Sequence, residues 1–355
     1  MKIAYIRKLQ YDPDDINVRL QYFKLGYIIH MIENKKLTIY DDDLQYMPAS
    51  WTRKQKSLFI ESLLIKLPIP LFYFDGSNYC WKVIDGLQRL SAVNEFMQGK
   101  FKLVSLEYLK EECEGCSYSD LPGYLRARLS EAEIVAYVIS PGTPLAVKYN
   151  IFKRINETAA HLNGQEIRQV FFHGQAGIFL KELAELPIFR ELSKEHVTRR
   201  RMKDKEFINR FIAFSFLLDV YDGDMDAFLY KGMDVLDGFD KEQLAFASQI
   251  FVKGLERSAQ LFDNYLFRKP STDETWSKTW NKAVYDTCMY NLARIDEEKM
   301  QILLNNKRAF LDEFIVSFTK GGALYSSITN SPDSRQSVMA RINGLKDLMD
   351  KYIEL

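Results

Sequence analysis

The chain has 355 residues, of which 47% are hydrophobic and 14% aromatic, a composition typical of globular proteins that excludes a disordered chain. Its 48 basic and 48 acidic residues cancel, so nucleic-acid binding would need a local basic patch. No apolar run approaches the length of a membrane-spanning helix, and the N-terminal residues lack the apolar core of a signal peptide. Four cysteines are too few for a disulfide framework. We therefore expect a cytoplasmic protein with no membrane partner.

The first part of the chain mixes helical and strand patterns. Apolar spacing and turn residues predict, in chain order, a helix over 25–32, a strand over 37–40, a helix over 53–66 capped by Thr52, a hairpin of strands 71–74 and 79–84, a helix over 87–97, strands over 102–104 and 134–139, and a helix that opens at 143–144. Beyond residue 156 the strand patterns fade. Helical patterns follow at 164–172, 205–220, 241–267, 277–293, 298–319 and 335–354. These patterns predict an α+β fold with a small mixed sheet in an N-terminal domain, residues 1–165, followed by an all-helical domain, residues 166–355.

The stretch from Val83 to Leu90 joins a strand to a helix through an Asp-Gly turn. Asp85 and Gln88 have the spacing of a capping box, which would explain both without a ligand. That reading does not explain Arg89, because a cation in the first helical turn costs about 0.3–1 kcal/mol. Gly86, the free N–H groups of the helix and Arg89 are together suited to a phosphate. The sequence leaves both interpretations open.

A second polar group follows in the stretch 152–168. Asn163 and Glu166 have the spacing of an N-cap and its N3 partner at the start of a helix. Capping does not explain the other polar residues of this stretch, Arg154, Asn156 and Arg168. They are suited to a phosphate or a base edge, but a set of surface salt bridges would have the same residue types.

Three charged or metal-binding patterns have equally plain alternatives. The densest basic run precedes a helix and is either a solvated helix start or a contact for DNA or RNA phosphates; it contains Arg199, Arg200, Arg201 and Lys203. Asp41, Asp42 and Asp43 are either a solvated loop or ligands for a divalent cation. Cys113 and Cys116 have zinc-ligand spacing but no second pair, which favours packing. No metal ligand is assigned.

Several of these stretches, in the same order and spacing, resemble the N-terminal domain family of the GmrSD restriction endonucleases. They are residues 60–64, 67–70, 83–90, 152–156 and 162–168. The resemblance covers roughly residues 20–170. It implies a ParB/sulfiredoxin-like fold for the first domain and binding and hydrolysis of a nucleoside triphosphate, GTP or another, with Mg²⁺ as a candidate companion.

The family motif reads Asp-Gly-Gln-Gln-Arg, and this chain has Asp-Gly-Leu-Gln-Arg at residues 85–89. The resemblance implies catalytic roles for Asp85, Gln88 and Arg89, with Asp85 orienting a metal or water and Gln88 positioning the attacking water. It implies a nucleotide-binding role for Gly86, Leu87, Gln45, Arg154, Asn156, Glu166 and Arg168. The chain departs from the family at Leu87 and at Tyr46, which replace a glutamine and an arginine. Both changes remove polar contacts, so binding is expected to survive better than hydrolysis.

The expected function is a nucleotide-binding and hydrolysing component of a prokaryotic anti-phage, DNA-restricting system. The four histidines, His30, His161, His173 and His196, are too far apart for the His-Asn-His nuclease motif that many relatives carry. A partner nuclease subunit and DNA are therefore candidate partners, and the oligomeric state is left open. The alternatives are a non-catalytic DNA-binding or regulatory module that uses the basic run, and a ParB-like nuclease that uses the acidic residues near Asp41.

Overall fold

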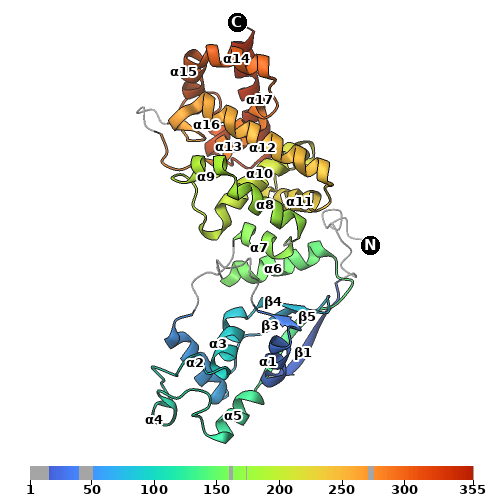
Figure 1. Ribbon diagram of the computed structural model, residues 1–355, viewed down its shortest axis with the longest axis vertical. Helices are drawn as coiled ribbons and strands as arrows, with labels where there is room; N and C mark the ends of the chain where they lie inside the picture. The colour runs from blue at the N-terminus through green and yellow to red at the C-terminus, as the bar shows by residue number, and fades with distance from the viewer. Residues whose placement is uncertain (1–15, 40–50, 160–162, 173, 271–275, 355) are drawn as a thin grey trace, which may run out of the picture. The chain divides into compact units, whose positions relative to one another are not determined.

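The computed structural model describes residues 16–39, 51–159, 163–172, 174–270 and 276–354. The chain divides into two compact units, residues 1–162 and residues 163–355, whose elements are labelled in Figure 1. Among the described residues, none of the helices is both long enough and apolar enough to cross a bilayer. Gln45, Tyr46 and the acidic residues Asp41–Asp43 lie outside the described residues.

A five-stranded mixed sheet organises the first unit (Figure 1). Strand β1 (Val18–Lys24) pairs antiparallel with β5 (Glu133–Ile139), and β3 (Phe72–Asp75) pairs antiparallel with β4 (Trp81–Asp85). Parallel pairs join β5 to β3 and β4 to the short strand β2 (Leu37–Thr38). The β3–β4 pair confirms the predicted hairpin. Its second strand delivers Asp85 to the start of the following helix.

The described part of the first unit also contains helices, some of which contact the strands directly. They are α1 (Leu25–Glu33), α2 (Arg53–Leu64), α3 (Leu87–Met97), α4 (Lys110–Cys113), α5 (Gly123–Ser130) and α6 (Leu145–Ala159). Helices α2 and α3 lie side by side, and α1 and α5 pack with them (Figure 1). The core contains Ile60 of α2, Phe96 of α3 and the alternate β5 residues Ile134, Ala136 and Val138. A capping box between Thr52 and Gln55 confirms the predicted start of α2.

Two parts of the sheet differ from the prediction. Strand β1 has no counterpart among the predicted elements because it is an edge strand whose Leu20 and Tyr22 side chains are exposed, so its sequence lacks a clear buried face. The predicted strand at 102–104 is wrong. Leu103 instead donates its N–H to the carbonyl oxygen of Cys116 at 2.9 Å and accepts from the N–H of Gly115 at 2.8 Å, which closes a loop.

The second unit is helical throughout its regular described elements, so the chain as a whole is α+β with a helical C-terminal region. Its elements are α7 (Gly164–Phe171), α8 (Gln175–Glu185), α9 (Pro187–Ser193), η4 (Arg200–Met202), α10 (Lys203–Leu217), η5 (Leu218–Val220), α11 (Met225–Asp237), α12 (Lys241–Phe262), η6 (Asp263–Tyr265), α13 (Lys282–Leu292), α14 (Glu297–Asn305), α15 (Lys307–Phe318), α16 (Tyr325–Thr329) and α17 (Arg335–Ile353).

Capping and backbone geometry shorten or divide three of the predicted helices. The helix expected over 298–319 breaks at Asn306, whose side-chain amide donates to the carbonyl oxygen of Tyr352 at 2.9 Å. Helix α13 begins only after Asn281, which caps it by accepting from the N–H of Val284. Helix α12 ends before Asp263, where φ is +47°. Local polar groups therefore set boundaries that apolar periodicity does not reveal.

A buried ionic cluster ties together α10, α13 and α17. Arg210 donates from Nε and Nη2 to the two carboxylate oxygens of Asp286 at 2.9 and 2.5 Å. Nη2 of Arg341 lies 3.5 Å from the same carboxylate, and both Asp286 and Arg341 are fully buried. Because the three charged groups come from three helices, this cluster fixes their mutual register.

Candidate functional site

The junction between β4 and α3 is the strand-turn-helix element that the sequence singles out. Asp85 ends β4, Gly86 is the N-cap of α3, and Leu87 is the first helical residue. The predicted capping box between Asp85 and Gln88 is wrong, because the cap position belongs to Gly86 and no cap side chain accepts a hydrogen bond there. Gln88 instead accepts, through its side-chain oxygen, from the backbone N–H of Trp51 at 3.2 Å.

Only glycine fits at the turn itself. Gly86 has a φ of +99°, in the left-handed region that residues with a Cβ rarely adopt. A Cβ at this position would lie 2.2 Å from the Phe72 ring, so the hairpin packs directly on the bare backbone. The first intrahelical bond runs from the N–H of Leu90 to the carbonyl oxygen of Gly86 at 2.9 Å. No side chain of the described residues caps the N–H groups of the first turn, which leaves them oriented for an anion.

Arg89 lies within the protein at this junction and is only 8% exposed. Its guanidinium donates to the carbonyl oxygens of Pro70 and Leu71 and to the Asp85 carboxylate, and it lies over the Phe72 ring with 4.2 Å between its central carbon and the ring centroid. Burial lowers the pKa of Arg89, and the neighbouring Asp85 charge opposes that shift. The arginine that the phosphate interpretation needed as a free cation is therefore occupied by protein groups.

The other nucleotide-site residues lie on separate elements. Arg154 is exposed on α6, and Asn156 follows on the same helix. Glu166 and Arg168 belong to α7 in the second unit, where both are buried. Asn163 and Glu166 form a capping box, as the sequence predicts. Gln45 lies outside the described residues.

Ion pairs inside the second unit engage both charged residues of α7. Arg168 pairs with Asp226 at 2.6 Å and donates from Nε to Gln165 at 3.1 Å. Glu166 pairs with Arg201 at 3.1 Å. The tertiary contacts therefore show a structural role for each of them, whereas the family resemblance implied that both bind a nucleotide.

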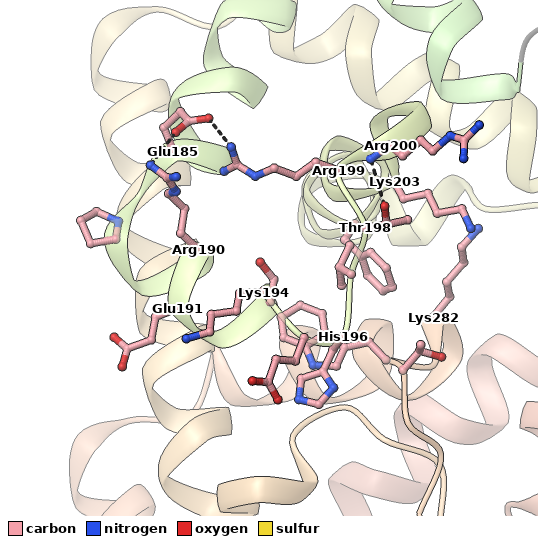
Figure 2. A pocket seen from close by; sticks show the side chains of 17 residues that line it. Glu185, Arg190, Glu191, Lys194, His196, Thr198, Arg199, Arg200, Lys203 and Lys282 are labelled. Carbon is pink, nitrogen blue, oxygen red and sulfur yellow. Dashed lines mark hydrogen bonds and ion pairs between the residues drawn. The ribbon is translucent and has the colours of Figure 1, made fainter. Parts of the chain in front are cut away.

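The basic run divides at η4. Arg201 and Met202 have φ values of +61° and +53°, and Asn163 holds the first of them by donating from its side-chain amide to the Arg201 carbonyl oxygen at 2.7 Å. Arg201 thus engages the α7 cap, whereas Arg199, Arg200 and Lys203 line a pocket with a volume of about 1220 Å³ (Figure 2).

Residues from other elements complete this pocket, and sequence reasoning missed them. Lys194 follows α9, His196 and Trp280 lie on connecting segments, and Lys282 begins α13. They fall in two short stretches, 194–196 and 280–282, which lie far apart in the sequence. No sequence signal marks them as neighbours, because only the tertiary fold brings the two stretches together.

The zinc-ligand spacing of Cys113 and Cys116 finds no support among the described residues, whereas Asp41–Asp43 lie outside them and stay untested. All four cysteines are free, and no group of three or more histidine, cysteine, aspartate or glutamate side chains is arranged to hold a metal ion in the described part of the chain. Burial raises the pKa of Cys113 to about 11, so its thiol stays protonated and packs in the core of the first unit.

The first unit is a small α+β domain built around a strand, a glycine turn and an uncapped helix start. Residues 28–173 match the family described as GmrSD restriction endonuclease, N-terminal domain. This segment of the chain belongs to that family, which confirms the resemblance seen in the motifs. Comparisons with curated proteins and with solved structures found no match. The ParB/sulfiredoxin-like fold therefore stays a prediction, and the family of this segment points to a restriction system.

Proposed function

We propose that the chain is the nucleotide-binding component of its restriction system and that the β4–α3 junction takes the phosphates of a nucleoside triphosphate. The observation that carries this proposal is the uncapped start of α3 directly after a glycine in the left-handed region, within a GmrSD N-terminal domain. Helix N–H groups and the positive end of the helix dipole favour a phosphate at such a position. Gly86 lets the phosphate approach the backbone closely.

Arg89 has a positioning role in this proposal. By bonding to Asp85 and to the carbonyl oxygens of Pro70 and Leu71, it fixes the end of β4 and the chain before β3 around the turn. The backbone N–H groups of Leu87 and Gln88 then face the ligand from a rigid frame. A bound nucleoside triphosphate would supply a phosphoanhydride bond whose hydrolysis can drive a change in a partner.

We propose that this chain retains nucleotide binding, whereas hydrolysis is weak or absent. Leu87 supplies no polar group where the family motif has a glutamine, and the Gln88 side chain is engaged by the Trp51 N–H. Neither side chain is free to position an attacking water in this arrangement. We assign DNA cutting to a partner nuclease, and no step is assigned to Mg²⁺ because the described residues offer no cluster of ligands for it.

The substitution Gln88→Glu tests the proposed phosphate site without removing a contact. The carboxylate has nearly the shape of the amide and still accepts from the Trp51 N–H, and a negative charge in the first turn favours the helix. It would repel phosphates held by the same turn. We expect affinity for a GTP and ATP panel, measured by isothermal titration calorimetry, to fall by about tenfold or more, as expected for one added charge a few ångströms from the phosphates.

Gln55→Glu is the matched control. It adds the same charge in the first turn of α2 in the same unit, at a capping-box position where glutamate serves as well as glutamine. Its affinity should equal that of the unsubstituted protein. Equal affinity of the Gln88→Glu variant and the unsubstituted protein, or failure of the protein to bind any nucleoside triphosphate, contradicts the proposal.

A non-catalytic DNA-binding module is the second candidate. The engagement of Arg89 by Asp85 favours it, because the most suggestive cation of the motif already has a partner. Phosphate release from the nucleotide panel, with and without DNA, separates the two functions. DNA binding without nucleotide binding supports the second.

A further inference from the structure

The basic pocket of the second unit is built by segments far apart in the sequence (Figure 2). The end of α8 and helix α9 form one side, the segment 194–200 and the start of α10 a second, and residues 279–282 a third. In Figure 2, Arg190 and Lys194 lie on one side of the view and Arg200, Lys203 and Lys282 on the other. The cations thus line a broad hollow and do not converge on one point.

The pocket is locally positive although the whole chain is neutral. Six lysine and arginine side chains line it against three glutamates, which leaves a formal excess of three positive charges. Glu185 pairs with Arg199 at 2.9 Å and with Arg190 at 3.2 Å, and Lys282 pairs with Glu206 at 2.6 Å.

The three remaining cations, Lys194, Arg200 and Lys203, are exposed, and none of them has an ion pair within the described part of the chain. A pocket with this excess attracts anions at long range and exchanges small counterions for a polyanion.

A buried donor without a partner also lines the pocket. Trp280 is 5% exposed, and its indole N–H finds no acceptor among the described residues. The ring stacks on His196 with 6.4 Å between ring centroids and 18° between ring planes. His196 donates from Nδ1 to the carbonyl oxygen of Lys278 at 2.8 Å, which fixes its ring. An unsatisfied buried N–H costs about 1–3 kcal/mol unless an acceptor reaches it. The stacked rings of Trp280 and His196 thus form a rigid part of the pocket wall.

We propose that this pocket binds the phosphodiester backbone of a nucleic-acid strand, with Lys194, Arg200 and Lys203 contacting phosphates on two sides of the hollow. A free nucleotide fits less well because its phosphates are adjacent, whereas these cations are spread over α9, η4 and α10. A strand that crosses the hollow meets them in succession. The inference goes beyond the proposed nucleotide site and does not depend on it.

The test uses the full chain and a triple variant, Lys194→Ala with Arg200→Ala and Lys203→Ala. Fluorescence anisotropy with a labelled single-stranded oligonucleotide and with its duplex gives the affinity between about 50 and 200 mM salt. We expect the variant to bind at least about tenfold more weakly. Its slope of log affinity against log salt should be shallower by about 2 for a single strand or about 3 for a duplex, because three phosphate contacts are lost. The two arms show which form the pocket prefers.

A second triple variant controls for charge. Lys241, Arg308 and Lys346 are also exposed residues of the second unit, have no ion pair in the described part of the chain, and lie outside the pocket. Their replacement by alanine also removes two lysines and one arginine, so the change in net charge equals that of the pocket variant. The affinity for the oligonucleotide should change by less than about twofold. Equal loss in both variants, no loss in the pocket variant, or no binding by the unsubstituted protein overturns the proposal.

A mononucleotide titration keeps this result apart from the proposed nucleotide site. The pocket variant should bind a nucleoside triphosphate as the unsubstituted protein does, and Gln88→Glu should leave oligonucleotide binding unchanged. If the pocket variant loses mononucleotide affinity to the same extent as oligonucleotide affinity, the pocket takes a small phosphate ligand and the proposal of a strand is wrong.

Discussion

Nη2 of Arg89 lies 2.9 Å from a carboxylate oxygen of Asp85, one helical turn away, and the same guanidinium also bonds the chain just before β3. The pair joins the end of β4, the start of α3 and the chain before β3 at one point. Two residues of the Asp-Gly-Leu-Gln-Arg motif thus hold the turn that presents the helix amides. Substitutions at Arg89 therefore test stability first, which is why Gln88 is the better position for testing binding.

Arg89→Ala should lower the free energy of unfolding by about 2 kcal/mol, because it removes a buried guanidinium and leaves partly buried acceptors at Pro70, Leu71 and Asp85 without their donor. Chemical denaturation followed by tryptophan fluorescence measures the change. Arg53→Ala, an exposed position at the start of α2, should alter stability by less than about 0.5 kcal/mol. Similar unfolding curves for both variants would show that the buried guanidinium contributes little.

Glu61 is a buried carboxylate whose removal should loosen a loop. It accepts from the backbone N–H groups of Glu107, Tyr108 and Leu109 at 2.7–3.1 Å and is 3% exposed. Glu61→Ala should cost about 3 kcal/mol, and Glu61→Gln less, because the amide oxygen still accepts. Denaturation gives the cost, and hydrogen exchange at Tyr108 and Leu109 shows where it arises. Glu107→Ala, an exposed neighbour, is the control; exchange that stays slow in Glu61→Ala contradicts the role.

In the second unit, Asp286→Asn should be the more severe of two related changes. The substitution leaves the buried guanidiniums of Arg210 and Arg341 facing a neutral amide, with an expected cost of about 3–5 kcal/mol. Asp333→Asn alters a half-exposed carboxylate 3.4 Å from Arg210 and should cost less than about 1 kcal/mol. Thermal melting of both variants ranks them. A larger loss of stability in Asp333→Asn than in Asp286→Asn would show that the exposed ion pair stabilises the unit more than the buried cluster does.

Cys113 and Cys116 should differ in the rate at which they react with an alkylating reagent. Burial raises the pKa of Cys113 to about 11, so its thiol resists deprotonation in the folded state, whereas Cys116 is only half-buried. Because the raised pKa favours the protonated thiol, its contribution to folding stability is fully present below the ordinary thiol pKa of about 8.5. This contribution is lost as the pH rises towards about 11. Alkylation between about pH 7 and 10, resolved by mass spectrometry, should label Cys116 before Cys113. Equal labelling rates in the native protein, matching those in denaturant, would contradict this assignment.

Local patterns anticipated much of the first unit. The hairpin, the Thr52 cap and most of its helices follow from turn residues and from apolar spacing, which act over a few residues, and so does the Asn163–Glu166 capping box at the start of the second unit. The family motifs were recognisable for the same reason. The residue types of the motifs and their order can be read from the sequence, independently of the contacts that each side chain makes in the fold.

Partner choice across the fold was not accessible from the sequence. Spacing alone suggested that Asp85 and Gln88 would cap α3, but the Phe72 ring and the Trp51 N–H decided otherwise. The roles of Glu166 and Arg168 depend on Arg201 and Asp226, which lie 35 and 58 residues further along the chain. A charged residue looks the same in sequence whether it meets a ligand or a distant ion-pair partner.

The amino-acid sequence by itself determined the α+β character, the helical second half, the family of residues 28–173 and the glycine turn before α3. Only the tertiary structure decided that Arg89 is held by Asp85 and that Lys194, Arg200, Lys203 and Trp280 line one pocket. Secondary structure and motifs arise from neighbours within a few residues. The pairing of charges and the shape of a pocket arise from long-range packing, which brings together side chains that no short stretch contains.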